Sequence, residues 1–167
     1  MQIILSDVHS NLEALSAVLS DIKKRFNKDI QIISLGDLVG YGPNPIECIL
    51  LAIQHNFINI MGNHELALSK DKTNFNPSAQ RAIFWTKTII QKNLANPKVS
   101  QFLKSLAYEY RTESSAFSGG IVYAHGSPRG VVDEYVIRRD DLFNLTEEVK
   151  KNLKENFESV EEVGFLG

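Results

Sequence analysis

Three short apolar runs alternate with two amphipathic segments early in the chain, and this alternation limits the folds that the chain can adopt. The apolar runs cover residues 2–5, 30–35 and 57–61. Between them, apolar residues recur at helical spacing over residues 12–26 and again over residues 45–55. Strands that alternate with helices in this way form parallel sheets with crossover helices. We therefore expect an α/β fold, in which ligands bind beyond the carboxyl ends of the strands.

The rest of the chain predicts more helices and a second group of strands. Helices are expected over residues 77–94, 97–106 and 144–157. Strands are expected over residues 108–111, 116–118 and 121–124, and the apolar run 163–167 resembles a strand that has just begun. In the first of these helices we place six residues in the core: Ile83, Phe84, Trp85, Ile89, Ile90 and Leu94. A chain of 167 residues fits one domain, residues 1–167.

A polar cluster follows each of four predicted strands. The clusters are Asp7-Val8-His9, Gly36-Asp37-Leu38-Val39-Gly40, Gly62-Asn63-His64-Glu65 and His125-Gly126-Ser127-Pro128. Each cluster alone is weak evidence of a site, but three of the four histidines in the chain lie within them. Parallel neighbouring strands would bring all four clusters to one crevice. Mixed oxygen and imidazole ligands suit manganese, iron or zinc better than calcium or magnesium.

Composition excludes several classes of partner. The net charge is −2, so no basic excess points to a stable nucleic-acid partner. Cys48 is the single cysteine, which rules out an intrachain disulfide and favours a reducing compartment. No apolar run approaches the roughly 18 residues of a membrane span. We therefore expect a cytoplasmic protein that does not bind membranes.

The order Asp-x-His, Gly-Asp, Gly-Asn-His-Glu, His-Gly resembles the calcineurin-like metallophosphoesterase family. The wording Ser-Asp-Val-His-Ser-Asn-Leu-Glu-Ala-Leu and Gly-Asp-Leu-Val-Gly-Tyr-Gly-Pro-Asn-Pro is similar to a branch of small bacterial and archaeal predicted phosphoesterases. The resemblance extends from Ser6 to Pro128. It implies a layered α/β sandwich with a second sheet. It also implies that phosphomonoesters or phosphodiesters are hydrolysed by a dinuclear metal centre, through a metal-bridging hydroxide.

The same resemblance implies a role for each residue of the clusters. The ligands of two divalent metal ions would be Asp7 and His9 for the first, Asn63 and His125 for the second, and Asp37 as the bridge. His64 would bind neither ion and would protonate the leaving oxygen or stabilise the transition state. We expect manganese, with iron or zinc as alternatives, and a small phosphorylated substrate.

Three further residues lie near the clusters. Arg129 is expected to grip a phosphate oxygen, with a solvated surface arginine as the alternative. Asn11 is expected either to bind phosphate at a helix N-terminus or to cap that helix. Glu65 is expected to cap a helix or to face solvent.

The sequence departs from the family pattern at its end. That pattern closes with Gly-His-x-His after a strand, whereas this sequence reads Val163-Gly164-Phe165-Leu166-Gly167 there. We therefore expect a truncated domain with an incomplete second sheet, whose exposed edge a homodimer would cover. The alternative function is a catalytically impaired homologue that keeps the fold and a weakened metal site. A phosphate-binding loop built on Gly36, Gly40 and Gly42 is disfavoured, because the spacing matches neither the Rossmann fingerprint nor the P-loop.

Overall fold

The first sheet contains the three parallel strands that the sequence predicts. The computed structural model describes residues 1–26, 29–70, 75–113, 120–136, 145–158 and 163–166. In this sheet β1 (Gln2–Leu5), β2 (Gln31–Ser34) and β3 (Ile58–Asn59) lie in the order β1-β2-β3. Ile3 pairs with Ile32, and Ile33 pairs with Ile58. All carboxyl ends therefore meet at one edge, and the predicted α/β class is confirmed.

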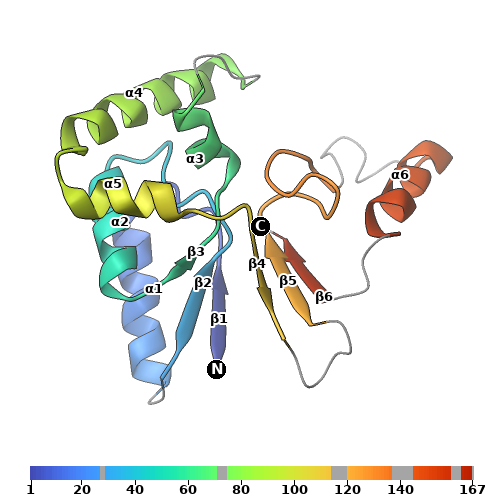
Figure 1. Ribbon diagram of the computed structural model, residues 1–167, viewed down its shortest axis with the longest axis horizontal. Helices are drawn as coiled ribbons and strands as arrows, with labels where there is room; N and C mark the ends of the chain where they lie inside the picture. The colour runs from blue at the N-terminus through green and yellow to red at the C-terminus, as the bar shows by residue number, and fades with distance from the viewer. Residues whose placement is uncertain (27–28, 71–74, 114–119, 137–144, 159–162, 167) are drawn as a thin grey trace.

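Four helices lie on one side of this sheet (Figure 1). They are α1 (Leu12–Arg25), α2 (Pro45–Gln54), α4 (Pro77–Asn93) and α5 (Pro97–Ser105). Each of the last three begins with an Asn-Pro pair. Proline is favoured at the first helical position, because the N–H that it lacks would have no partner within the helix there. The asparagine side chains of Asn76 and Asn96 accept hydrogen bonds from backbone N–H groups of the first turn.

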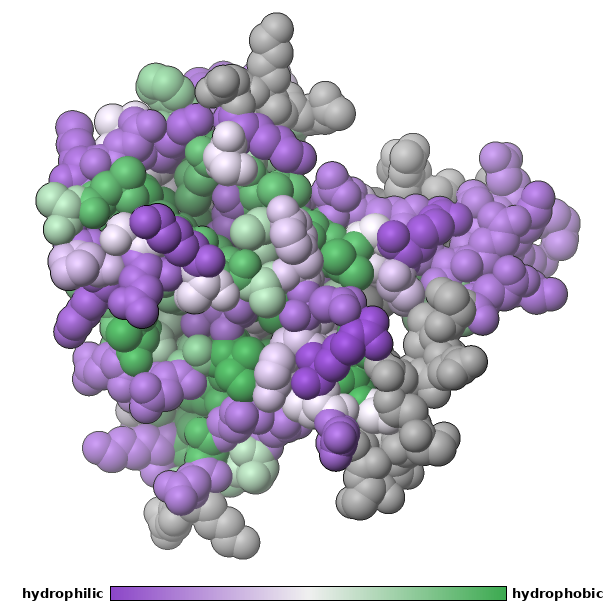
Figure 2. Space-filling model, viewed as in Figure 1, coloured by the Kyte–Doolittle hydropathy of each residue, from purple (hydrophilic) through white to green (hydrophobic). Residues whose placement is uncertain are grey.

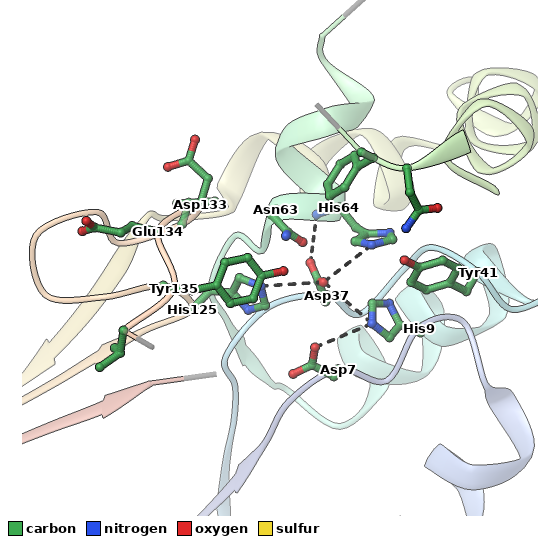
Figure 3. Close-up of a pocket in the computed structure, with 15 residues that line it drawn as sticks. Asp7, His9, Asp37, Tyr41, Asn63, His64, His125, Asp133, Glu134 and Tyr135 are labelled. Atoms are coloured by element: carbon green, nitrogen blue, oxygen red, sulfur yellow. Dashed lines mark hydrogen bonds and ion pairs between the residues drawn. The ribbon is translucent and has the colours of Figure 1, made fainter. Parts of the chain in front are cut away.

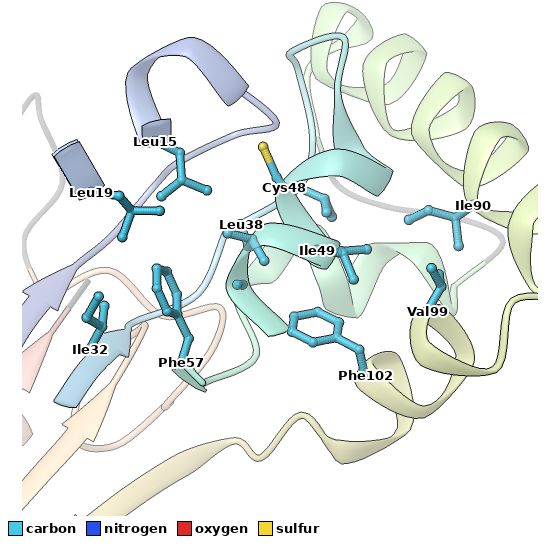
Figure 4. Packing of buried hydrophobic residues seen from close by; sticks show 12 residues of the cluster. Leu15, Leu19, Ile32, Leu38, Cys48, Ile49, Phe57, Ile90, Val99 and Phe102 are labelled. Carbon is cyan, nitrogen blue, oxygen red and sulfur yellow. The ribbon is translucent and has the colours of Figure 1, made fainter. Parts of the chain in front are cut away.

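Strand β2 is buried on both faces and divides the core in two. Ile32 packs with apolar residues of the four helices, among them Leu15, Ile49 and Phe102 (Figure 4). Ile33, one residue further, packs on the opposite face with Tyr123 of the second sheet. This opposition follows from the two-residue period of a strand, and it explains why β2 reads as a continuous apolar run.

The second sheet contains β4 (Glu109–Thr112), β5 (Ile121–Ala124) and β6 (Val163–Leu166), in the order β4-β5-β6. Strand β5 is antiparallel to β4 and parallel to β6. The prediction that all four clusters follow neighbouring parallel strands is therefore wrong, because the strand before His125 belongs to a different sheet. The Tyr123 hydroxyl donates a hydrogen bond to Gln2 Oε1 at 2.6 Å, which ties the two sheets together.

Two short helical elements complete the described fold. Helix α3 (Asn63–Leu68) follows β3 and was not predicted, since six residues are too few to show a helical period. Helix α6 (Glu147–Phe157) lies beyond the second sheet, and the surface over it is largely hydrophilic (Figure 2). The predicted strand at 116–118 lies outside the described residues. No helix in the described part of the chain is long and apolar enough to cross a membrane.

The core assignment within α4 is partly wrong. Ile83 and Ile90 are buried as predicted, but Phe84 is 73% exposed and Trp85 and Leu94 are also exposed. Apolar residues occupy more than one face of this helix, and only the face toward α2 and α3 is covered. Contacts with the rest of the fold, rather than hydropathy, decide which residues are buried.

Neighbouring alanine substitutions in α4 test this orientation. Ile83→Ala should lower the free energy of unfolding by about 2–5 kcal/mol, because it leaves a cavity in the core. Phe84→Ala removes a larger side chain but should change that energy by less than about 0.5 kcal/mol. Urea unfolding of both variants measures the difference. A larger loss from Phe84→Ala than from Ile83→Ala would contradict the orientation of α4.

Candidate metal centre

The loops that follow β1, β2, β3 and β5 converge on one open pocket of about 520 Å³ (Figure 3). Among its lining residues are the six that the family pattern places at the metal ions: Asp7, His9, Asp37, Asn63, His64 and His125. The crevice is therefore where the sequence predicts it, although His125 reaches it from the second sheet.

The carboxylate of Asp37 lies at the centre of this group. Its Oδ2 atom is 3.8 Å from His9 Nε2, 3.9 Å from His64 Nε2 and 3.7 Å from His125 Nε2. His9 Nε2 is also 3.6 Å from Asp7 Oδ1. These separations are too long for hydrogen bonds. They suit atoms that share a cation, since metal–nitrogen and metal–oxygen bonds are about 2.0–2.2 Å for zinc.

Two overlapping sets of potential ligand atoms share Asp37. One set is His9, Asp37 and His64, and the other is Asp7, Asp37 and His125; within each set the atoms lie within 4.8 Å of one another. Asp37 belongs to both sets, so one buried carboxylate faces two clusters of donors.

Backbone carbonyls orient two of the imidazoles. His125 Nδ1 lies 2.9 Å from the carbonyl oxygen of Leu35, and His9 Nδ1 lies 3.4 Å from that of Val39. A carbonyl only accepts, so each Nδ1 carries the proton and donates it. When the ring is neutral, each Nε2 presents a lone pair toward Asp37, which is the arrangement of a histidine that can bind a metal ion.

Asn63 provides an independent test of whether a metal ion fits. Its Oδ1 atom is buried and has no hydrogen-bond partner among the residues that the structure describes. An unpaired buried carbonyl oxygen costs free energy, and a cation would satisfy it. The neighbouring donors are imidazole nitrogens and carboxylates, which suit manganese, iron or zinc. The residues present therefore fit a divalent metal ion.

Burial and crowding of charge shift the pKa values of the metal-free site. The interaction with His9 lowers the pKa of Asp7 to about 2. Burial, and then the negative charge of Glu65, raise the pKa of Asp37 to about 7. Burial, and then the nearby His9 and His125, lower the pKa of His64 to about 4, so its ring is neutral at pH 7. Opposed shifts of this size in one pocket are typical of functional sites.

Glu65 fixes the loop that carries Asp37. Its Oε2 accepts hydrogen bonds from the backbone N–H groups of Asp37 and Gly62, and its Oε1 accepts one from Val39, all at 2.9 Å. Because Gly62 precedes α3, the expectation that Glu65 caps a helix is confirmed. The alternative that it faces solvent is wrong, since the side chain is buried and burial raises its pKa.

Left-handed backbone conformations accompany the site. Asp7, His9 and Asp37 all have φ between +49° and +55°, which is uncommon for residues other than glycine. Gly36 has φ +102°, and a Cβ atom there would lie 2.6 Å from Gly62 Cα and 2.9 Å from His125 Nδ1. A glycine is therefore required where the loops after β2 and β3 approach His125.

The two predicted phosphate contacts do not line the pocket. Asn11 is the N-cap of α1, and its Oδ1 accepts a hydrogen bond from the N–H of Ala14 at 3.0 Å. The guanidinium of Arg129 pairs with Glu134 and lies 3.9 Å from Glu155. The capping alternative for Asn11 is confirmed, while substrate contact by Asn11 or Arg129 remains a prediction.

Three aromatic residues of the pocket were missed in the sequence. Tyr41, Phe75 and Tyr135 line it together with the predicted residues. Tyr41 stands between two glycines directly after the Gly-Asp cluster, and that position was the only available signal. Phe75 and Tyr135 lie outside the motifs, so no pattern of spacing could have identified them.

A substitution at Glu65 tests whether it holds the Asp37 loop. Glu65→Gln should lower the free energy of unfolding by about 1–3 kcal/mol, because its amide nitrogen would face backbone N–H donors. Glu113→Gln, at an exposed position, is the control and should change it by less than about 0.5 kcal/mol. Urea unfolding measures both. Equal stability of the two variants would contradict the role of Glu65.

Comparison with known proteins agrees with this geometry. The chain is 39% identical over 150 residues to an uncharacterized protein of Methanocaldococcus jannaschii, covering 84% of this chain and 56% of that protein. It is 34% identical to a metallophosphoesterase from Sphaerobacter thermophilus of known structure, with a TM-score of 0.67, covering 99% of this chain and 59% of the other. A candidate diadenosine tetraphosphatase shares the fold alone, at 21% identity and a TM-score of 0.50, over 76% of this chain and 50% of the other.

The chain thus spans a little over half the length of the archaeal and Sphaerobacter relatives. The family model for calcineurin-like phosphoesterases matches residues 3–163, which include all four polar clusters. The chain therefore belongs to the calcineurin-like phosphoesterase family.

Proposed function

We propose that this chain forms a dinuclear, metal-dependent phosphoesterase site that hydrolyses phosphomonoesters or phosphodiesters. The observation that carries the proposal is the position of Asp37, which belongs to both sets of potential ligand atoms and whose Oδ2 lies 3.8 Å from His9 Nε2 and 3.7 Å from His125 Nε2. A carboxylate with two oxygens is the natural bridge between cations that are roughly 3.5–4 Å apart. We propose manganese as the metal, with iron or zinc as alternatives.

The family pattern supplies the division of ligands that we propose. Asp7 and His9 would hold one ion, Asn63 and His125 the other, and Asp37 would hold both. The unpaired Oδ1 of Asn63 supports its place in this set. Metal ions held here would supply Lewis acidity and would lower the pKa of water, which makes a nucleophile available near neutral pH.

His64 is the proposed catalytic residue that does not bind metal. Its backbone N–H donates to Asp37 Oδ1 at 2.9 Å, and its Nε2 atom lies 3.9 Å from Asp37 Oδ2. The family implies two roles for this ring: it protonates the leaving oxygen, or it donates a hydrogen bond to charge that develops on oxygen in the transition state.

The other polar contacts keep these groups in place while the reaction proceeds. The carbonyls of Leu35 and Val39 fix the tautomers of His125 and His9. Glu65 holds the N–H groups around Asp37, so the bridging carboxylate stays in position when charge changes nearby. A prearranged site of this kind stabilises a transition state without reorganisation during the reaction.

Hydrolysis of p-nitrophenyl phosphate and bis(p-nitrophenyl) phosphate with added manganese tests the proposal. We expect turnover that a chelator abolishes, and His64→Ala should lower kcat about 10²–10⁴-fold, the usual contribution of a positioned acid or base. His55→Ala is the matched control, since His55 is the one histidine outside the clusters and follows α2.

Elemental analysis of the same preparations separates loss of catalysis from loss of metal. His64→Ala should retain the metal content of the unsubstituted chain. Turnover no higher than that of His64→Ala, with fewer than two tightly bound metal ions per chain, would favour the catalytically impaired homologue with a weakened metal site. Failure to bind manganese, iron or zinc would contradict the proposed metal centre.

A further inference from the structure

The residues that line the pocket are charged or polar at its floor and mainly aromatic or apolar at its mouth. The floor is formed by carboxylates and imidazoles, whereas Tyr41, Phe75 and Tyr135 line the same pocket with Val132. A pocket of about 520 Å³ has room for more than a phosphate group. A ligand that fits both regions has a charged phosphate and, attached to it, an apolar or aromatic body.

Tyr41 is held over the centre by an uncommon backbone conformation. Its φ is +51°, a value that bulky residues rarely adopt, and Gly40 and Gly42 flank it. The ring centroid lies 4.6 Å from that of His64 and 4.9 Å from that of His9. The residue is nevertheless 51% exposed, so part of the ring remains free for a ligand. A turn alone would be formed more easily by asparagine or glycine, which suggests that the side chain itself has a use.

Tyr135 lies on the other side of the centre. Figure 3 shows Tyr41 and Tyr135 on opposite sides of Asp37, each with its hydroxyl turned toward the middle of the pocket. Tyr135 is 71% exposed. Large exposed aromatic residues at the mouth of a polar pocket are typical of ligand-binding sites.

Hydrogen bonds and an ion pair fold the loop that precedes Tyr135. The N–H of His125 donates to the carbonyl of Val131, and the N–H of Ser127 donates to that of Gly130, both at 3.1 Å. The side chain of Glu134, beside Tyr135, pairs with Arg129 and accepts a hydrogen bond from Ser127. The loop that leads to Tyr135 is thus folded upon itself beside the pocket.

We propose that Tyr41 and Tyr135 bind the organic part of the substrate and select phosphate esters with a planar aromatic group next to the phosphate. This inference rests on the proposed function, because the phosphate must sit at the metal centre. Aromatic rings stack in offset or edge-to-face geometry, which two tyrosines on opposite sides of the pocket offer to a flat group between them. An aryl ester and a nucleoside ester share this chemistry.

Binding of non-hydrolysable phosphonates tests the inference without relying on catalysis. Calorimetry on the manganese-loaded chain compares phenylphosphonate with methylphosphonate, which has the same anion without the ring. We expect Tyr41→Ala and Tyr135→Ala each to weaken phenylphosphonate about tenfold and methylphosphonate less than about twofold. Tyr41→Phe and Tyr135→Phe keep the ring and should retain most of the affinity.

Tyr108→Ala is the matched control, since Tyr108 is 53% exposed and does not line the pocket. It should leave the affinity for both phosphonates unchanged. Equal losses for both ligands in Tyr41→Ala would overturn the inference, because the tyrosine would then serve the metal centre. Unchanged phenylphosphonate binding in both alanine variants, or a loss in the phenylalanine variants as large as in the alanine ones, would overturn it as well. If neither phosphonate bound the unsubstituted chain, the proposed function would fail together with the inference.

Discussion

The buried carboxylate of Glu65 accepts three backbone hydrogen bonds, and the geometry of the whole metal centre depends on them. Its donors are the N–H groups of Asp37, Val39 and Gly62, so one side chain joins the loops after β2 and β3. Hydrogen bonds to a charged acceptor are stronger than neutral ones, and in a buried place they are not screened by water. Asp37 stays between the three histidines because Glu65 accepts a hydrogen bond from its backbone N–H.

The centre also requires two sheets to meet at their ends. The loops after the parallel strands contribute Asp7, His9, Asp37 and the first turn of α3, while the second sheet contributes His125. A small apolar cluster around Ile33 and Tyr123 packs the sheets together, and the bond from His125 Nδ1 to the carbonyl of Leu35 links them at the site itself. Loosening this contact between the sheets would separate His125 from Asp37 without altering either residue. Stability of the fold and assembly of the site are therefore coupled.

Much of this arrangement was predictable because parallel strands place their carboxyl ends together. The positions of Asp7, Asp37 and Asn63 followed from that rule and from the apolar runs before them. The membership of β5 in a second sheet did not, because a short apolar run carries no information on which strand it pairs with.

Phe84 and Trp85 were placed in the core, although the rest of the fold covers only one of the apolar faces of α4. Tyr135 was missed because its place depends on the folding of a loop, which leaves no periodic trace in the sequence. The pairing of Arg129 with Glu134 is local and equally without a periodic signal.

Anomalous X-ray diffraction at the manganese edge, from crystals grown with the metal, tests the central claim most directly. We expect two peaks, roughly 3.5–4 Å apart, with the carboxylate of Asp37 between them. Nitrogen atoms of His9 and His125 and the Oδ1 of Asn63 should lie about 2.0–2.3 Å from a peak. No anomalous peak beside Asp37, or peaks that leave its carboxylate unbound, would contradict the claim that this residue bridges a dinuclear centre.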